Sequence, residues 1–400
     1  GKGGWWAQGI EGRSEPGWKG GQGVKEEGRK RKDMMCIIFA SDNETERNEL
    51  TLHRTTASLP VCGRYRFIDF TLSNFVNSQI TNLGIITRNN YSSLTDHIRM
   101  GRDWDLNRKN GGIAVFPPYF SNSARSMNRG KIEALYSVLD FVQHAPEEYV
   151  VVTNSNIAAN IDFESVFNYH MEKGADITML TYTACPNTSR KVIVSEDMAG
   201  RVTDMRVTQT PSSTPAEIGL NIYLSRKDLL IDLITDSYER GYTDLEKHIL
   251  QQKKDSLKIY GYHVDGYVGV IDDIKSYYHE SMRILDTNLR NDLFTRNGTI
   301  FTKVKDSVPT RYRDGANVKN SLIADGCDIN GTVINSILFR GVKVEAGAVI
   351  ENSIVMEGGK VCSGAKMSYI IADKDVTITE DKKISGYETY PMVIVKGKTV

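Results

Sequence analysis

Apolar residues recur at every sixth position through the C-terminal part of the 400-residue chain. Two such series can be followed between turn-forming Asn, Gly, Asp and Ser residues: Leu338, Val344, Ile350, Met356 and Cys362 in one, and Val349, Val355, Val361 and Met367 in the other. A period of six fits neither the 3.6-residue repeat of an α-helix nor the two-residue repeat of a flat strand. It is typical of a parallel β-helix, in which each six residues form one short strand and one corner. We therefore expect a left-handed parallel β-helix over residues 316–385, followed by a C-terminal segment, 386–400.

Earlier in the chain, short apolar runs alternate with segments of helical periodicity. The runs that we expect to form buried strands are 35–40, 83–87, 149–153 and 176–182. The segments that we expect to form helices are 70–78, 131–143 and 163–173. Buried strands that alternate with helices indicate an α/β fold of the Rossmann-like type with a mostly parallel sheet. This pattern predicts one domain over residues 34–286, joined to the β-helix by a linker, 287–315.

The charge balance and the cysteine pattern argue against several classes of protein. The 50 Lys and Arg residues equal the 50 Asp and Glu residues in number, so no excess of positive charge favours a nucleic acid or a membrane surface as a partner. No apolar run approaches the roughly 18–20 residues of a membrane span. The five cysteines are scattered without a C-x-x-C pair, which favours free thiols in the cytoplasm over disulfides or a zinc site.

Residues 1–33 differ from the rest of the chain in composition. They are rich in glycine and charge, lack apolar periodicity and contain Ile10-Glu11-Gly12-Arg13, a string typical of engineered protease sites. We expect this segment to be a tag or disordered, with the native start at Met34 or Met35.

The segment from Gly63 to Asn74, with the sequence Gly-Arg-Tyr-Arg-Phe-Ile-Asp-Phe-Thr-Leu-Ser-Asn, closely resembles the G-[KR]-[YF]-R-x-I-D-F-x-L-S-N segment of ADP-glucose pyrophosphorylases. Four shorter strings stand where that family has similar ones: Arg129-Gly130, Gly219 to Tyr223, Phe301 to Asp306 and Val318 to Ser321. The resemblance covers residues 34–385. It implies the layout of the sugar-nucleotide pyrophosphorylases, a nucleotidyltransferase domain followed by a hexapeptide β-helix. Active members join ATP to glucose 1-phosphate, forming ADP-glucose and pyrophosphate.

That reaction brings several anionic groups together, so its site needs backbone N–H donors, cations and a magnesium ion held by carboxylates. The resemblance places the family's phosphate-binding loop, G-G-x-G-x-R-L, on residues 41–47. Its glycine positions carry Ser41, Asp42 and Glu44 here, and its arginine position carries Glu46. A triphosphate beside these acids would be repelled by on the order of 1–4 kcal/mol per close contact.

Other positions of the family's active site are altered as well. The resemblance places Thr56 at the lysine of the K-P-A string, and Gln209 and Thr210 at the sugar-phosphate-binding pair of E-K-P. It places Asn156 and Tyr267 at the two aspartates that hold magnesium, an ion that prefers charged oxygen ligands. These changes imply a chain that has no catalytic residues, binds no metal or cofactor of its own and shows little or no activity alone.

A retained fold with an altered site resembles the non-catalytic, GlgD-type subunits of bacterial ADP-glucose pyrophosphorylase. That resemblance implies a regulatory subunit in glycogen biosynthesis, which joins a catalytic GlgC-type subunit in a tetramer and leaves ATP and magnesium to this partner. Cationic residues of the family bind sugar-phosphate activators at the place occupied here by His53, Arg54, Arg64 and Arg66. Arginine suits that role because its guanidinium donates paired hydrogen bonds to phosphate. Arg64 and Arg66 could instead pair with acids such as Asp69.

The resemblance also implies remnants of substrate binding. The residues concerned are Arg129, Gly130, Gly219 and Asn221. Arg125, Arg129 and Lys131 flank a segment that lies near the nucleotide in the catalytic relatives, and they are either vestigial or hold a residual ligand.

Other functions stay open on the sequence. Asp272 and Asp273 lie near the second metal position and could serve a rearranged metal site in an active nucleotidyltransferase. The chain could also be a sugar-phosphate sensor without an enzyme partner. A β-helix acyltransferase is disfavoured, because those enzymes usually carry a catalytic histidine in the β-helix and residues 316–385 contain none.

Overall fold

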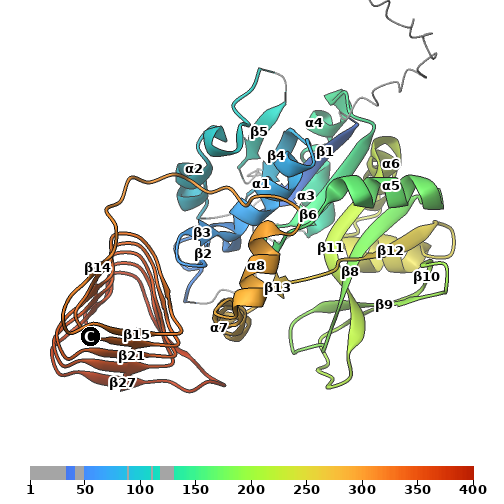
Figure 1. Cartoon of the computed structure of the whole chain (residues 1–400). Coiled ribbons are helices and arrows are strands. Elements are labelled where there is room, and N and C mark those ends of the chain that lie inside the picture. The colour runs from blue at the N-terminus through green and yellow to red at the C-terminus, as the bar shows by residue number, and fades with distance from the viewer. Residues whose placement is uncertain (1–32, 41–48, 88–89, 110, 118–129) are drawn as a thin grey trace, which may run out of the picture. The chain divides into compact units, whose positions relative to one another are not determined.

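The part of the chain that the structure describes begins with an α/β domain built on a mixed nine-stranded sheet (Figure 1). This computed structural model describes residues 33–40, 49–87, 90–109, 111–117 and 130–400, which all lie in one unit, Lys32–Val400. Four strands pair in parallel in the order β5-β4-β1-β6, and their bounds are Gly112–Phe116, Asn82–Ile86, Met34–Phe39 and Tyr149–Asn154. β1 and β6 are buried on both faces, which accounts for their unbroken apolar runs.

The α/β fold is confirmed, and the structure adds an antiparallel part to the sheet. β11 (Ala216–Arg226) runs antiparallel to β6, and it also pairs with β8 (Ile177–Ala184) and β9 (Lys191–Glu196). β10 (Val202–Thr208) is antiparallel to β9, and β12 (Ile259–His263) is parallel to β8. Two short pairs stand outside this sheet: β2 (Pro60–Val61) with β3 (Tyr65–Arg66), and β7 (Ile157–Ala159) with β13 (Val268–Val270).

Helices pack on both faces of the sheet. Their bounds in the described residues are α1 (Phe67–Asn77), α2 (Ser92–Ile98), α3 (Lys131–Tyr136), α4 (Leu139–His144), α5 (Phe163–Lys173), α6 (Lys227–Glu239), α7 (Ile274–Arg283) and α8 (Thr287–Thr295). None of them has the length and apolar character that crossing a bilayer requires. The predicted helix 163–173 is confirmed as α5, which begins after the Asp162 cap and ends at Gly174 with φ +57°. The segment predicted as one helix over 131–143 forms two, α3 and α4.

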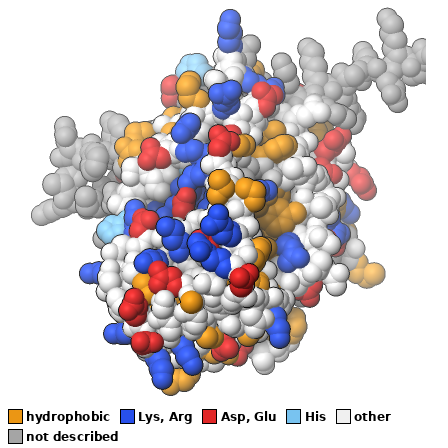
Figure 2. Space-filling view, turned by 60° about the vertical axis from the view of Figure 1, so that its left-hand side comes forward, with side chains coloured by type: hydrophobic (Ala, Val, Ile, Leu, Met, Phe, Trp, Pro, Cys, Tyr) orange, Lys and Arg blue, Asp and Glu red, His pale blue; other side chains and the backbone are white. Residues whose placement is uncertain are grey.

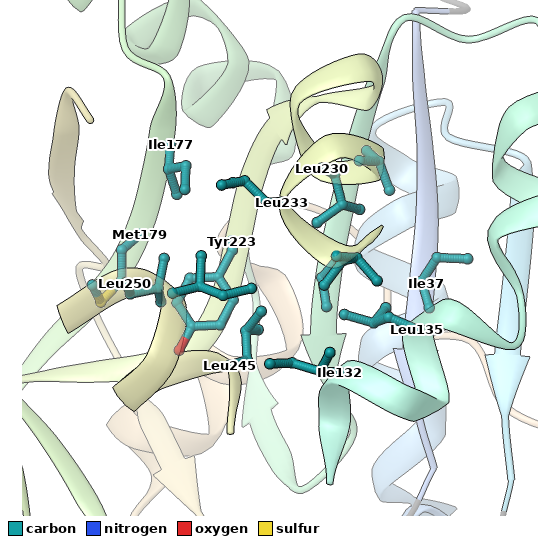
Figure 3. Close-up of a cluster of buried hydrophobic side chains, with 14 of the residues drawn as sticks. Ile37, Ile132, Leu135, Ile177, Met179, Tyr223, Leu230, Leu233, Leu245 and Leu250 are labelled. Atoms are coloured by element: carbon teal, nitrogen blue, oxygen red, sulfur yellow. The ribbon is translucent and has the colours of Figure 1, made fainter. Parts of the chain in front are cut away.

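Two apolar cores lie on opposite faces of the sheet because strand side chains alternate. Met35, Ile37 and Phe39 of β1 face a core with α3, α4 and α6, which Figure 3 shows in close-up. Cys36 and Ile38 face the other core, with α1, α2 and α5.

The C-terminal part is a parallel β-helix of three sheets, as predicted (Figure 1). The first sheet consists of β14 (Arg311–Tyr312), β17 (Asp328–Ile329), β20 (Lys343–Val344), β23 (Lys360–Val361) and β26 (Thr377–Ile378). The second consists of β15 (Asn317–Lys319), β18 (Thr332–Ile334), β21 (Val349–Glu351), β24 (Lys366–Ser368) and β27 (Lys383–Ser385). The third consists of β16 (Leu322–Ile323), β19 (Ile337–Leu338), β22 (Ile354–Val355), β25 (Ile370–Ala372) and β28 (Met392–Ile394).

The six-residue period slips by one residue in each coil of the β-helix from Lys343 onward. Residues that point into its core follow one series that joins parts of the two expected ones: Leu338, Val344, Ile350, Val355, Val361, Met367, Ala372 and Ile378. The step from Ile350 to Val355 is five residues, so that Lys343 pairs with Lys360 only 17 residues later. Met356, which was expected to belong to the same series as Ile350, therefore points out of the β-helix toward the α/β domain.

Left-handed corner residues accompany this slip. They are an asparagine before a serine in three coils, and Tyr369 in the step from Met367 to Ala372. Asn320, Asn335 and Asn352 have φ between +43° and +45°, a left-handed conformation that asparagine tolerates and that closes a corner in fewer residues. The serine after each asparagine joins a ladder of hydrogen bonds. The Ser353 N–H donates to Ser336 Oγ at 3.1 Å, for example.

The middle strands of the third sheet are buried on both faces, and their outer face packs on the α/β domain. These strands carry two successive apolar residues, whereas strands of the first sheet, such as Lys343–Val344, carry one polar and one apolar residue. Ile337, Ile354 and Ile371 point outward into a core that also contains residues of α1, α7 and α8. α8 lies within the segment 287–315, which was expected to be a linker, and its Leu293 is fully buried in this core.

A buried ion pair connects the α/β domain to the β-helix. Arg54 Nη2 donates to both carboxylate oxygens of Asp373 at 2.8 Å, and the two side chains are 5% and 2% exposed. The Tyr278 hydroxyl donates to the Asn352 carbonyl at 2.7 Å across the same contact. The contact therefore combines a large apolar core with a few hydrogen-bonded polar groups.

Candidate functional site

Ligands of open α/β sheets bind beyond the carboxyl ends of the strands, where the strand order reverses. β1 stands at that point, because the chain passes from it to β4 on one side and later to β6 on the other. The residues that follow β1 and β6 therefore border the expected active site. Ser41, Asp42, Glu44 and Glu46 follow β1 but, like Arg129, lie outside the described residues, so their roles stay predictions.

Asn156 follows β6 and holds two segments of backbone together. Its side chain is buried, and its Nδ2 donates a hydrogen bond to the Ile271 carbonyl at 2.9 Å. The Ile271 N–H donates in return to the Asn156 carbonyl at 3.0 Å, which extends the pairing of β7 with β13. An aspartate carboxylate has no N–H and would face the Ile271 carbonyl oxygen. This position is therefore suited to a neutral amide in a structural role.

Tyr267, at the second metal position that the resemblance implied, is a core residue. It is 4% exposed and belongs to the apolar core between the α/β domain and the β-helix. Its phenol donates to Glu280 Oε2 at 3.0 Å, and the Arg283 guanidinium lies 5.1 Å from its ring centroid. Burial and the Glu280 carboxylate raise the pKa of Tyr267 well above its ordinary value. The phenol therefore stays protonated and is a poor ligand for magnesium.

Three further positions that the resemblance implied carry uncharged side chains, namely Thr56, Gln209 and Thr210. Thr56 begins the short helix η1 (Thr56–Ser58), and the Ala57 N–H donates to the Ala40 carbonyl just after β1. Gln209 and Thr210 follow β10 and are exposed. The next residue, Pro211, lines a cavity of about 590 Å³ beside β8, β13 and α7.

Asp272 and Asp273 already have structural partners. Asp272 forms an ion pair with Lys191, whose side chain is 8% exposed. Asp273 caps α7, because its Oδ1 accepts from the Ser276 N–H at 2.6 Å. Within the described ranges, no three His, Cys, Asp or Glu side chains form a group that could hold a metal ion. Both carboxylates would have to leave their partners to bind a metal, which argues against the rearranged metal site.

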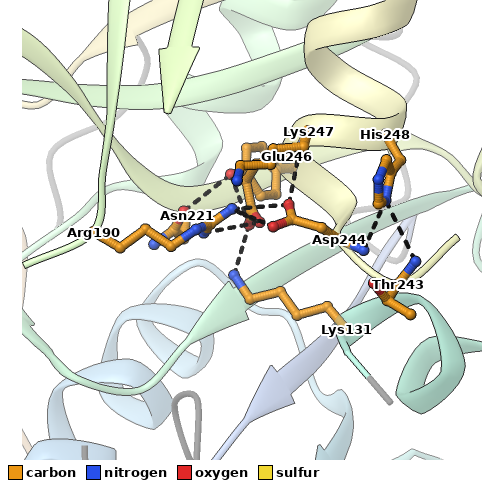
Figure 4. A network of polar contacts seen from close by, with 9 residues as sticks. Lys131, Arg190, Asn221, Thr243, Asp244, Glu246, Lys247 and His248 are labelled. Carbon is orange, nitrogen blue, oxygen red and sulfur yellow. Dashed lines mark hydrogen bonds and ion pairs between the residues drawn. The ribbon is translucent and has the colours of Figure 1, made fainter. Parts of the chain in front are cut away.

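Asn221 lies beside a buried network of charges (Figure 4), and Gly130 directly precedes Lys131, a member of that network. A Cβ atom at Gly130 would lie 2.1 Å from the Thr243 carbonyl oxygen, so this close approach requires glycine. Asn221 has φ +56° in a stretch where the pairing of β11 with β8 is irregular, between Gly219 and Tyr223. The structure thus brings two of the expected vestigial residues together at the edge of the sheet.

Glu246 is the centre of that network. It is 1% exposed and begins a π-helical turn, η3 (Glu246–Gln251), a rare geometry that is frequent at functional sites. Lys131 Nζ donates to one of its carboxylate oxygens at 2.7 Å, and Arg190 Nη1 donates to the other at 3.2 Å. Arg190 also donates to both oxygens of Asp244, at 2.8 and 2.7 Å. Burial opposes the ionisation of Glu246, but Lys131 and Arg190 outweigh it and lower the pKa to about 2.

The four cationic residues expected to bind an effector do not form one site. Arg54 is buried in its bidentate pair with Asp373, and it cannot contact an external phosphate without breaking that pair. We therefore assign Arg54 a structural role. His53 is exposed. Only Arg64 and Arg66 of the four line a common pocket.

That pocket has a volume of about 110 Å³ and lies between the α/β domain and the β-helix. Four further cationic residues line it, and sequence reasoning missed them as a group: Lys303, Lys305, Arg340 and Lys374. Asp96 and Glu357 are the carboxylates of its lining, so six cations face two acids. Figure 2 shows Lys and Arg side chains gathered near the middle of the face that carries the β-helix. We call this site the cationic pocket.

Two features of the sequence could have indicated these four additional cationic residues of the pocket. Lys303 and Lys305 lie two positions apart, a spacing that places both side chains on one side of a segment if it is extended. Arg340 and Lys374 are 34 residues apart, or two coils of 17, and Glu357 stands halfway between them in the same column of corners. A column of this kind becomes visible only when the coil length is known.

The charges of the cationic pocket are incompletely balanced. Glu357 pairs with Lys305 and with Lys374; burial opposes its ionisation, but these two lysines lower its pKa to about 2. Lys303 Nζ donates to a backbone carbonyl, that of Asp96, at 2.6 Å. Burial and then the nearby cations Arg99, Arg66 and Lys305 lower the pKa of Lys303. A bound anion would relieve this repulsion.

Comparisons with known proteins agree with this architecture. A nucleotidyl transferase family model matches residues 45–280, and a model of the GlmU-like C-terminal hexapeptide region matches residues 306–389. The glycogen biosynthesis protein GlgD of Bacillus subtilis (strain 168) is 33% identical over 91% of this chain and 96% of its own length. GlgD of Geobacillus stearothermophilus is 35% identical over 79% of this chain and 82% of its own. The glucose-1-phosphate adenylyltransferase of Mycoplasma mobile (strain ATCC 43663 / 163K / NCTC 11711) is 31% identical over 80% of this chain and 85% of its own.

Proposed function

The chain belongs to the nucleotidyl transferase family, with GlgD proteins and glucose-1-phosphate adenylyltransferases among its relatives, and from this premise we propose that it is a non-catalytic, regulatory subunit of an ADP-glucose pyrophosphorylase. It acts in glycogen biosynthesis in the cytoplasm by joining a catalytic GlgC-type subunit in a tetramer. The partner supplies the groups that bind ATP and magnesium, and this chain changes the partner's rate or its response to activators.

The observation that carries this proposal is the structural use of the two metal positions. Asn156 is tied to a backbone carbonyl, and Tyr267 is part of an apolar core. Phosphoryl transfer depends on a metal ion that neutralises developing charge. Neither side chain can take that role without losing its present contacts, while the fold around both is intact. A fold kept without its metal ligands supports a role in assembly or regulation.

The direct test is ADP-glucose synthesis from ATP and glucose 1-phosphate with magnesium. We expect the rate of this chain alone to be at least about 10²–10³-fold below that of the catalytic subunit, since even one lost electrostatic contact costs that much. We expect the two subunits together to form a complex on gel filtration and to differ from the catalytic subunit alone in kcat or activator response. Metal-dependent turnover by this chain alone would contradict the proposal, and a chain that binds sugar phosphate but never co-elutes would favour the sensor.

The cationic pocket supports a sugar-phosphate effector as the signal. Its lining offers Arg64 and Arg66, as the resemblance implied, together with the lysines of the segment before the β-helix and the corners of the β-helix itself. A ligand that bridges these groups would contact both domains. Such a ligand would therefore stabilise one arrangement of the domain contact, which is how binding can be transmitted to a partner subunit.

Replacing Lys303 with alanine is expected to weaken binding of a sugar bisphosphate, such as fructose 1,6-bisphosphate, by about tenfold or more. A hydrogen bond to a charged group contributes about 1.5–3 kcal/mol, and 1.4 kcal/mol corresponds to a factor of ten. Lys303 is the informative choice because its ammonium donates to a carbonyl, so that its removal leaves no carboxylate unpaired.

Lys343→Ala is the matched control, because Lys343 is an exposed lysine of the first sheet outside the pocket. Isothermal titration calorimetry of the isolated chain measures both variants. Equal dissociation constants for the two variants and the unaltered chain would place the effector elsewhere.

A further inference from the structure

The carboxylate of Glu246 occupies a place that has the features of an anion-binding site. Lys131 and Arg190 each donate to a different oxygen of this carboxylate, and the Tyr223 hydroxyl shares its proton between one of them, at 3.3 Å, and Asn221 Oδ1, at 3.1 Å. The three donors come from three separate elements, namely the start of α3, the residue before β9, and β11. Figure 4 shows the side chains of Lys131 and Arg190 converging on Glu246. Converging cations and hydroxyls are the donors that proteins use for phosphate.

The position of this group in the fold also fits a ligand site. Lys131 Nζ lies 5.9 Å from the ring centroid of Phe39, the last residue of β1. Ile222, the residue after Asn221, pairs with Thr153, the residue before the last of β6. The network therefore lies at the carboxyl ends of β1 and β6, where open α/β sheets bind their ligands.

A second observation at the same edge points to a missing partner. Asn154 is 4% exposed, and its Oδ1 accepts no hydrogen bond from the part of the chain that the structure describes. Buried polar atoms are nearly always paired, because an unpaired one costs about 1–3 kcal/mol. An acceptor left open at the end of the sheet that also carries these donors suits a ligand with both oxygens and a hydroxyl, as a protonated phosphate has.

The local backbone is shaped to bring Glu246 into this place. It begins the π-helical turn η3, and the preceding Thr243 carbonyl packs against Gly130 so closely that a Cβ atom there would be 2.1 Å away. Asp244, two residues earlier, holds the other edge of the Arg190 guanidinium. When Glu246 is removed, Arg190 Nη1 and Lys131 Nζ lose their carboxylate partner while Asp244 still orients Arg190.

We propose that Glu246 is an internal counter-ion that fills a phosphate-binding site at the carboxyl ends of β1 and β6, and that the site binds inorganic phosphate or pyrophosphate once this carboxylate is removed. In the unaltered chain the site is closed to external phosphates. Protonation does not open it at neutral pH, since the carboxylate stays ionised down to about pH 2. This inference does not depend on the proposed regulatory role, because its test measures anion binding by the isolated chain.

The test is the response of the Glu246→Ala variant to inorganic phosphate. We expect the variant to be less stable than the unaltered chain, because it leaves two buried cations without a counter-charge. We expect millimolar phosphate or pyrophosphate to raise its melting temperature by about 2 °C or more over sodium chloride of equal ionic strength. The unaltered chain is expected to show no such difference, and calorimetry is expected to detect phosphate binding by the variant alone.

Two further variants make the result specific. Asp236→Asn also removes a carboxylate shared by two cations, Arg240 and Lys253, but on an exposed surface, so it is expected to show no phosphate response. Adding Lys131→Met to Glu246→Ala is expected to reduce the response at least about threefold. A folded Glu246→Ala variant that ignores phosphate would overturn the proposal. If that variant is unfolded in chloride, recovery of its native circular dichroism in phosphate supports the proposal, and failure to recover overturns it.

Discussion

The Asp373→Asn variant is expected to unfold with a free energy about 3–5 kcal/mol lower than that of the unaltered chain, because it leaves the buried Arg54 guanidinium without a counter-charge. Arg54 and Asp373 are 5% and 2% exposed, and both carboxylate oxygens lie 2.8 Å from Arg54 Nη2. An asparagine can accept one hydrogen bond there but cannot neutralise the charge. The midpoint of urea unfolding, followed by circular dichroism, measures the loss.

Two controls separate the ion pair from a general effect of substitution in the β-helix. Asp328→Asn removes an equally bidentate partner from Arg313, but those side chains are 31% and 49% exposed, so we expect a loss of about 0–1 kcal/mol. The double variant Arg54→Met, Asp373→Leu is expected to recover most of the stability, because apolar side chains of similar volume fit a buried site. Equal losses of unfolding free energy for Asp373→Asn and Asp328→Asn would show that the buried ion pair contributes no more to stability than the exposed one.

The β-helix was the most predictable part of the fold, because its signal is local and repeated. Each short strand places one apolar residue in the core, and the period follows from that requirement. The slip at the corners was less visible, since it accompanies left-handed conformations, as at Asn335 and Asn352. The core series takes members from both expected series, and three expected members are not part of it: Val349, Met356 and Cys362.

The antiparallel part of the sheet was not predicted, because β11 lacks a simple pattern. It is buried on both faces and contains an irregular stretch between Gly219 and Tyr223, so its residues show neither alternation nor a short uniform run. The predicted parallel strands β1 and β6, by contrast, are short and almost uniformly buried runs. Whether a segment such as β11 forms a strand depends on its tertiary contacts, which a local sequence pattern does not reveal.

The candidate sites were predictable only where the resemblance named a position. The sequence gives the residue type at 156 and 267, but it does not reveal that the Asn156 amide binds a carbonyl or that Tyr267 is core. Arg54 illustrates the limit: its partner Asp373 is 319 residues away, and an arginine that binds phosphate looks the same in a sequence as one that binds a carboxylate. The cationic pocket combines three distant segments, which no short motif can indicate.

The Ile354→Asp variant is expected to lose at least about 4 kcal/mol of unfolding free energy, because it places a charge in the apolar core that joins the two domains. Ile354 is fully buried and points out of the third sheet toward the α/β domain. Removing a buried isoleucine costs about 2–5 kcal/mol, and burying an unpaired carboxylate adds to that. Urea unfolding of the isolated chain measures the effect.

Val349→Asp is the matched control, since Val349 is also a β-branched residue that points out of the same coil, but on the second sheet, where it is only partly buried. Its aspartate can reach water, so we expect a loss of less than about 1 kcal/mol. A similar loss in both variants would mean that the packing of the third sheet on the α/β domain contributes little. A much larger loss for Ile354→Asp than for Val349→Asp would instead show that the contact between the two domains, which borders the cationic pocket, contributes strongly to the free energy of unfolding. A ligand that changes this contact must then do so by small shifts within a packed interface, because separating the domains would expose the whole core.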